Sequence, residues 1–190
     1  MMYMKYKFIP NDTIIFNDKK LHRIVAIRDF GDVRIGDIGG YIENESNLSH
    51  NGDCWVYDNA KVFDNARIQH YAIVKDEVVI SGNVIVKNKS VITDRATIFD
   101  DVLIRDNTYV SGDATICNHA VIRDNAVISD NTVVKDYAVV KGNSFICEYA
   151  TICDHAVVYN SLISGKACIC GKATIEQHSN ISGNARIYGS

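Results

Sequence analysis

The chain repeats itself every six residues from Cys54 almost to its C-terminus. The first residue of each unit is small or β-branched, and the residue two places later is always valine or isoleucine, as in Cys54/Val56, Ala60/Val62 and Ala66/Ile68. This register holds over 23 units, with one residue missing near Tyr159 to Ser161. A strict short period of this kind predicts a repeat architecture in which each unit packs on its neighbours.

Each unit contains a strand that is too short to bury itself. The small residue and the Val/Ile residue point to the same side of the strand, because side chains alternate with a period of two. The three mostly polar residues that follow form a corner, where asparagine and glycine supply left-handed backbone conformations. We therefore expect a stacked coil with rungs about 4.8 Å apart, whose inward columns form one continuous core.

The repeat resembles a known family in units such as Val62-Phe-Asp-Asn-Ala-Arg and Val110-Ser-Gly-Asp-Ala-Thr. These units are similar to the hexapeptide repeat of left-handed β-helix proteins. The resemblance covers residues 42–190 and implies an all-β fold, a left-handed parallel β-helix with three units per triangular coil. The segment 21–43 is also similar to the leader of uncharacterised phage and bacterial members that are labelled acyltransferases, a label inferred from fold.

Residues 1–41 precede the repeat and predict a small N-terminal β-cap over the first rung, which would otherwise be an unpaired edge. Strands are expected at 5–9, 13–16 and 21–27, with a hairpin turn at 17–20 and the sole proline, Pro10, between the first two. Gly36, Gly39 and Gly40 would lead from the cap into the β-helix of residues 42–190, which would have seven to eight coils. The C-terminal rung has no cap of its own.

Three units per coil sort the outward residues of the strands into three faces. The first face is mixed, whereas the second and third are apolar over their central rungs. The predicted oligomer interface comprises Ile85, Leu103, Val121 and Val139 on the second face and Ile73, Val91, Tyr109, Val127 and Phe145 on the third. The alternative is that β-propensity alone places valine and isoleucine there. Two contiguous apolar stripes favour a homotrimer, as the family resemblance also implies.

A line of basic residues follows the second face. Lys87, Arg105, Arg123 and Lys141 occupy one corner column in four consecutive rungs, over about 15 Å. They predict binding of an anionic small molecule, such as a phosphate-bearing ligand, or of an acidic protein surface. The alternative is a solvated ridge that Asp106 and Asp124 neutralise.

His119 and His155 share a corner column with Tyr137, following the first face. The family resemblance implies that coenzyme-A acyltransferases use a histidine as general base at a subunit interface, so these two histidines are the candidate catalytic residues, with acetyl-coenzyme A as acyl donor. The alternative is that they are interchangeable corner residues, since Asn65, Asn83 and Asp101 occupy the same column. No excursion loop interrupts the coil, which argues against an enzyme.

The cysteines and the overall charge are less informative. Cys153 and Cys170 lie on adjacent rungs at a spacing that permits a disulfide, but without a secretion signal near the N-terminus we expect reduced thiols that fill corners, a cytoplasmic protein and no metal site. No apolar run is long enough to span a membrane. The net charge of −3 makes nucleic acid an unlikely partner.

Three functions remain open from the sequence. The preferred one is a homo-oligomeric binding or interaction protein that engages an anionic ligand or a host protein, with a phage as a candidate source. The alternative is a coenzyme-A-dependent acyltransferase that uses His119 or His155. The third is a self-assembling structural protein, in which the uncapped C-terminal rung stacks end to end.

Overall fold

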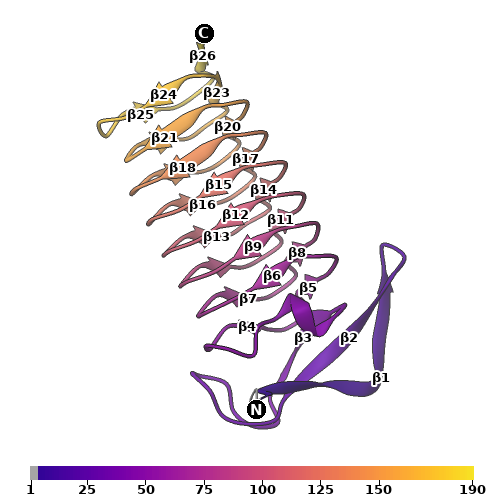
Figure 1. Cartoon of the computed structure of the whole chain (residues 1–190). Helices are drawn as coiled ribbons and strands as arrows, with labels where there is room; N and C mark the ends of the chain where they lie inside the picture. Colours follow the sequence, from indigo (N-terminus) through magenta and orange to yellow (C-terminus); the bar gives the residue numbers. More distant parts are fainter. Residues whose placement is uncertain (1–3) are drawn as a thin grey trace.

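The chain forms a triangular parallel β-helix, seen in a computed structural model that describes residues 4–190. Figure 1 shows the coils stacked in one column, with the β1–β2 hairpin beside the first coils and the C-terminus at the opposite end. Each strand pairs in parallel with the strand three units later, as in Thr97 with Thr115 and Leu103 with Val121. The prediction of a left-handed β-helix with three units per coil is confirmed.

Three sheets make the sides of the prism, and each holds one of the faces expected from the sequence. The first sheet contains β1 (Tyr6–Phe16), β2 (Lys19–Ala26), β3 (Ile38–Ile42), β5 (Lys61–Val62), β8 (Val79–Ile80), β11 (Thr97–Ile98), β14 (Thr115–Ile116), β17 (Val133–Val134), β20 (Thr151–Ile152), β23 (Cys168–Gly171) and β26 (Arg186–Gly189). The second contains β6 (Arg67–Ile68), β9 (Ile85–Val86), β12 (Leu103–Ile104), β15 (Val121–Ile122), β18 (Val139–Lys141), β21 (Val157–Tyr159) and β24 (Thr174–Ile175). The third contains β4 (Trp55–Val56), β7 (Ile73–Val74), β10 (Val91–Ile92), β13 (Tyr109–Val110), β16 (Val127–Ile128), β19 (Phe145–Ile146), β22 (Leu162–Ile163) and β25 (Asn180–Ile181).

The core is the column of inward residues that the repeat predicts. From Ala60 to Ile169 the inward alanine, valine and isoleucine side chains are buried. Some units carry serine or threonine at the small inward position. Most of these hydroxyls donate to the carbonyl three residues earlier, as Thr108 does to Arg105 at 2.7 Å and Ser144 to Lys141 at 2.7 Å, whereas Ser161 donates to Tyr159, two residues earlier. A buried hydroxyl costs little once it is paired, so these units keep the register without a cavity.

The corners depend on a ladder of carboxylates. The middle corner residue has a positive φ in coil after coil, and it is most often aspartate, as at Asp94 (62°), Asp124 (67°) and Asp136 (62°). Its carboxylate accepts the backbone N–H of the corner one coil later, for example Asp94 from Gly112 at 2.8 Å and Asp124 from Gly142 at 3.0 Å. The sequence predicted left-handed corners but not this ladder, which gives the corner aspartates a structural task.

The N-terminal strands differ in detail from the prediction. β1 is one strand through Pro10, with a register shift against β2 between Phe8 and Thr13, where Asn11 has a φ of 64°. A proline lacks an N–H to pair, and the bulge accommodates it. β3 was not expected, because glycines are weak strand formers. β3 forms because it pairs with β2 on one side and with β5 on the other. Glycine at position 39 permits the close packing on Trp55, since a Cβ there would lie 2.7 Å from the Trp55 side chain.

The boundary between cap and β-helix stays a prediction. β3 pairs in antiparallel fashion with β2 and in parallel with β5, so one sheet runs across residues 41 and 42. A 3-10 turn, η1 (Glu45–Asn47), follows β3. The first three residues of the predicted cap lie outside the described residues.

A buried polar cluster fixes the cap to the first coil. Lys5 is fully buried, and its Nζ donates to the carbonyls of Gly52 at 3.0 Å and Cys54 at 2.7 Å. Burial lowers the pKa of Lys5, against the opposing effect of Cys54. The Lys5 backbone N–H donates to Nδ1 of His50 at 3.3 Å, and the His50 ring stacks on Tyr6 with the ring centroids 4.4 Å apart. His50 is therefore held in its neutral form.

Acidification is expected to weaken this cluster. Burial, with smaller contributions from Lys5 and Arg28, lowers the pKa of His50 against the raising effect of Glu45. The unfolded chain then binds more protons than the folded one just below the ordinary histidine value of about 6.5. The free energy of unfolding should fall as the pH drops through this window, and recover above it. Urea denaturation at about pH 7.5 and 5.5 measures the difference; His50→Asn should reduce it, and an unchanged difference would implicate other groups.

Candidate active site

His119, Tyr137 and His155 stack on one edge of the prism. This edge, called the histidine edge, is the corner column Asn65, Asn83, Asp101, His119, Tyr137 and His155 between the first and second sheets. The ring of Tyr137 lies 4.7 Å from that of His119 and 4.9 Å from that of His155, and the planes are nearly parallel. The structure thus brings together the two histidines that the sequence singled out.

Asp101 distinguishes His119 from His155. Nδ1 of His119 lies 3.4 Å from Oδ2 of Asp101, and both side chains are about half exposed. The other carboxylate oxygen of Asp101 accepts the Asn83 amide at 2.6 Å, and the Asn83 oxygen accepts the Asn65 amide at 3.0 Å. In the part of the chain that the structure describes, His155 has no ion pair.

This arrangement supports proton transfer at one nitrogen. At 3.4 Å the two side chains are in contact without a hydrogen bond; a small side-chain movement would let Asp101 accept an Nδ1 proton of His119, and the neutral ring would then present the lone pair of Nε2. A carboxylate at Nδ1 orients the ring and stabilises the imidazolium that forms when Nε2 takes a proton. Sequence reasoning treated Asp101 as an interchangeable corner residue. The signal that could have found it is the separation of 18 residues between Asp101 and His119, which is one full coil.

The four predicted basic residues line the next edge, between the second and third sheets. We call Lys87, Lys89, Arg105, Arg123 and Lys141 the basic edge. Arg105 contacts Asp106 at 3.2 Å, Arg123 contacts Asp124 at 3.4 Å, and Nζ of Lys141 lies 5.3 Å from the centroid of the Tyr159 ring.

The charge of the basic edge is only partly compensated. Asp106 and Asp124 also accept backbone N–H groups, from Asp124 at 3.3 Å and from Gly142 at 3.0 Å, so they are shared with the corner ladder. Between residues 87 and 143 this edge carries five cations against two carboxylates. On the other two edges, the same number of coils lies between residues 93 and 155. Each of these two edges carries four carboxylates and one cation at its corners in this range. The molecule therefore has one positive edge and two negative ones.

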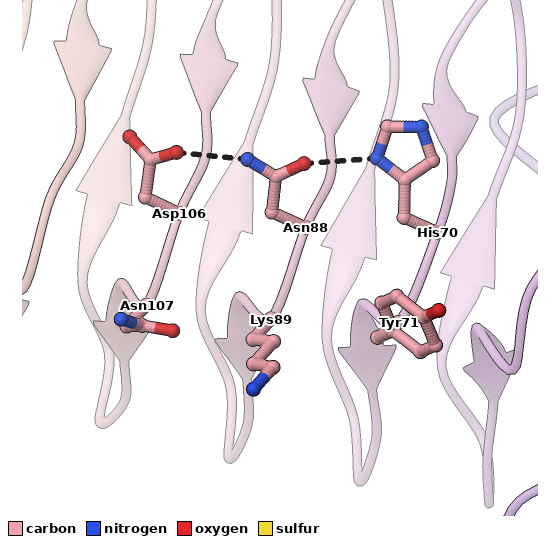
Figure 2. Close-up of a pocket in the computed structure, with 6 residues that line it drawn as sticks. All are labelled: His70, Tyr71, Asn88, Lys89, Asp106 and Asn107. Carbon is pink, nitrogen blue, oxygen red and sulfur yellow. Dashed lines mark hydrogen bonds between the residues drawn. The ribbon is translucent and has the colours of Figure 1, made fainter.

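A shallow depression of about 310 Å³ lies on the same edge, toward the third sheet. Figure 2 shows its two rows of side chains, in which Asp106, Asn88 and His70 are joined by hydrogen bonds. The Asn88 amide donates to Asp106 at 2.8 Å, and its oxygen lies 2.9 Å from Nδ1 of His70. Tyr71, Lys89 and Asn107 form the second row. No sequence motif marks this depression, because its residues come from three different coils.

The second face connects the two edges. In one coil, His119 on the histidine edge is followed by the short strand β15 and then by Arg123 on the basic edge. Four residues span at most about 14 Å. Between these ends lie the half-buried apolar side chains of Leu103 and Val121. The surface thus offers a proton acceptor, an apolar strip and cations within the reach of one extended ligand.

The outward apolar residues keep the faces that the sequence assigned. On the third face, Tyr109 and Phe145 are the most exposed of the predicted interface residues, at 41% and 42%. The other predicted interface residues are half-buried: Ile73, Val91 and Val127 on the third face and Ile85, Leu103, Val121 and Val139 on the second. Within residues 4–190 no helix is long and apolar enough to cross a membrane.

Comparisons with known proteins point to the same class of repeat. Residues 95–130 match the family described as bacterial transferase hexapeptide (six repeats), and this stretch includes Asp101, His119 and Arg123. An uncharacterized acetyltransferase of Escherichia coli (strain K12), YdcK, is 45% identical over 42 residues, which are 22% of this chain. The matched stretch spans 13% of the length of that relative.

Proposed function

We propose that this hexapeptide-repeat β-helix protein is a coenzyme-A-dependent acyltransferase in which His119 is the general base. The observation that carries the proposal is the contact between Nδ1 of His119 and Asp101, which leaves Nε2 free at the border of the second face. The similarity to an uncharacterized acetyltransferase, although short, supports the same reaction class.

The residues present fit an acyl-coenzyme-A donor. Its phosphates would bind Arg105, Arg123 and Lys87 on the basic edge, because guanidinium and ammonium groups pair with phosphate oxygens. Its extended chain would lie over Leu103 and Val121 on the second face and bring the thioester toward His119. The donor supplies an activated acyl group. The protein supplies its orientation and the proton acceptor.

His119 would act on the acceptor. Nε2 takes the proton of an acceptor hydroxyl or amine as the acceptor oxygen or nitrogen bonds to the acyl carbon. Asp101 holds the ring in place and stabilises the imidazolium. The same Nε2–H then returns its proton to the departing thiolate of the donor, which restores neutral His119.

A homotrimer would complete the site. Hexapeptide-repeat proteins commonly trimerise, and the second and third faces carry the apolar stripes of this chain. We infer that the third face, with Tyr109 and Phe145, packs beside the second face of the next protomer. This arrangement would exclude water from the donor, in place of the excursion loop that the chain lacks.

Sedimentation equilibrium tests the assembly. At micromolar concentration we expect the mass of three chains. Tyr109→Asp combined with Phe145→Asp should shift the population to monomers, because two charges would be buried at the interface without partners. Thr97→Asp, on the mixed first face, is the matched control and should leave the trimer intact. A wild-type monomer at micromolar concentration would refute the trimer.

Turnover with acetyl-coenzyme A tests the function. We expect the wild-type protein to bind acetyl-coenzyme A in calorimetry and to release the free thiol of coenzyme A when hydroxyl and amine acceptors are added. Absence of binding would overturn the proposal. Binding without thiol release across acceptor classes would instead favour a binding protein.

A non-catalytic anion-binding protein is the second candidate, favoured by the excess of cations on the basic edge. Its ligand would be a phosphate-bearing molecule or an acidic protein surface. Arg105→Ala combined with Arg123→Ala should abolish binding of coenzyme A while shifting the melting temperature by only a few degrees, since exposed ion pairs contribute little to stability. Arg95→Ala combined with Arg186→Ala, away from this edge, should leave binding unchanged. Retained binding in the first double variant would exclude the basic edge as the site.

A further inference from the structure

Three cysteine sulfurs meet near the C-terminal end of the histidine edge. Cys153 follows β20, and Cys168 and Cys170 lie in β23 one coil later. Cys153 and Cys170 form a disulfide, with their Cα atoms 4.8 Å apart. The expectation of reduced, corner-filling thiols is wrong for this pair. The six-residue register placed Cys153 and Cys170 on adjacent rungs at a spacing that permits this bond, but the residue pattern carries no sign of whether the two thiols are oxidised.

Cys168 is a free thiol in contact with this disulfide. Its Sγ lies 3.2 Å from Sγ of Cys170, and because a disulfide sulfur carries no hydrogen, the Cys168 thiol is the donor. All three sulfurs lie within 4.8 Å of one another. Cys168 and Cys170 are two residues apart, so they project to the same side of β23.

The remaining thiols are less accessible. Cys54, Cys117 and Cys147 are buried, and burial raises the pKa of each. Cys168 is half-buried, and among residues 4–190 it is the one free thiol that solvent reaches to this extent. A thiol reagent from solution would therefore meet Cys168 first.

We propose that Cys153, Cys168 and Cys170 form a thiol–disulfide exchange site in which Cys168 is the attacking thiol. The Cys168 thiolate, having lost its proton to water, bonds to Sγ of Cys170. The bond between Cys170 and Cys153 breaks, and the electron pair leaves with the Cys153 sulfur, which takes a proton from water. One disulfide is replaced by another, so the exchange needs no oxidant or reductant.

The geometry of β23 accommodates the second disulfide. The sulfurs of Cys168 and Cys170 already lie 3.2 Å apart. Two residues along a strand are about 6.6 Å apart, near the upper limit of about 6.8 Å for the Cα separation in a disulfide, so β23 must bend slightly to bring the two Cβ atoms within about 4.5 Å. The Cys153–Cys170 bond joins two consecutive coils, whereas a Cys168–Cys170 bond lies within one strand. Exchange thus releases the last coils from the covalent tie and exposes the Cys153 sulfur to small thiols such as glutathione. This inference is independent of the acyl-transfer proposal.

Peptide mapping tests the exchange directly. Cleavage after Lys166 and Lys172 places Cys168 and Cys170 in one peptide, residues 167–172, and leaves Cys153 in the peptide 142–166. Oxidised wild-type protein, held at about pH 8 with trace glutathione and quenched in acid, should yield both the bridged pair of peptides and the peptide 167–172 with an internal disulfide. Iodoacetamide should then label Cys153 as well as Cys168.

Two variants sharpen the result. In Cys168→Ser no label should reach Cys153, whereas Cys117→Ser, which removes a buried thiol of the same edge, should behave like the wild type. Cys153→Ser treated with oxidised glutathione should close the internal disulfide of peptide 167–172. The proposal is overturned if the wild type shows only the bridged peptides, or if Cys153→Ser retains glutathione on Cys168. The wild-type mapping decides the question even if a variant does not fold.

Discussion

His119→Gln is expected to lower the turnover number for acyl transfer by about 10²- to 10⁴-fold, the usual contribution of a positioned general base. Glutamine keeps a polar side chain that can still meet Asp101, but it cannot take a proton from an acceptor. Because the cations proposed to bind the donor lie on the basic edge, the dissociation constant for acetyl-coenzyme A should change by less than about threefold. Steady-state kinetics and calorimetry on the same variant separate the two effects.

His155→Gln is the matched control for this prediction. His155 stacks on the other side of Tyr137, but Asp101 contacts His119 instead. The turnover number of this variant should stay within about threefold of the wild type. If His155→Gln is the impaired variant and His119→Gln is not, the assignment of the general base is wrong, although the reaction class survives. If neither is impaired, the base lies elsewhere.

Asp101→Asn should have an intermediate effect. The carboxylate contacts Nδ1 of His119 and orients its ring, so its loss should lower the turnover number for acyl transfer while the dissociation constant for acetyl-coenzyme A stays within about threefold of the wild type. A purely structural role of Asp101 would instead lower the melting temperature and weaken donor binding as well.

The repeat made most of the fold predictable from the sequence. Period and register assigned each outward residue to its face and placed Tyr137 between His119 and His155, because in a coil of three units residues 18 apart must stack. Apart from the redox state of Cys153 and Cys170, the fold predictions failed where the repeat does not apply. Pro10 lies within β1 because a bulge accommodates it, and β3 forms across Gly39 because β2 and β5 pair with it on both sides.

Contacts between side chains of neighbouring coils were harder to predict. In the column that contains Asp101, two amides precede the carboxylate and three rings follow it. Whether the Asp101 side chain contacts His119 or points to solvent depends on its rotamer, which the repeat does not specify. The same holds for Asp124, which contacts Arg123 but also accepts a backbone N–H from the next coil. Counting charged residues in the sequence therefore overestimates how much of the positive charge on the basic edge these aspartates neutralise, because their carboxylates also accept backbone N–H groups.

Ile116→Ala is expected to lower the free energy of unfolding by about 2–5 kcal/mol, the range for truncating a buried isoleucine. Ile116 is fully buried in β14, and its strand neighbours Ile98 and Val134 occupy the same column one coil on either side. The hydrogen-bonded spacing of the coils prevents these neighbours from closing the cavity, so the upper half of the range is expected. Urea denaturation measures the loss.

Thr115→Ala is the matched control, because Thr115 is the adjacent outward residue on the first face and should change stability by less than about 0.5 kcal/mol. Since each coil contacts only its neighbours, the loss in Ile116→Ala should also be local. Amide exchange should accelerate by about 1,000-fold in β11, β14 and β17 for a loss near 4 kcal/mol, and much less in β5 and β23. Uniform acceleration of amide exchange along the β-helix would instead mean that the coils unfold as one cooperative unit. A decrease of less than about 1 kcal/mol in the free energy of unfolding would mean that the core column relaxes around the missing atoms.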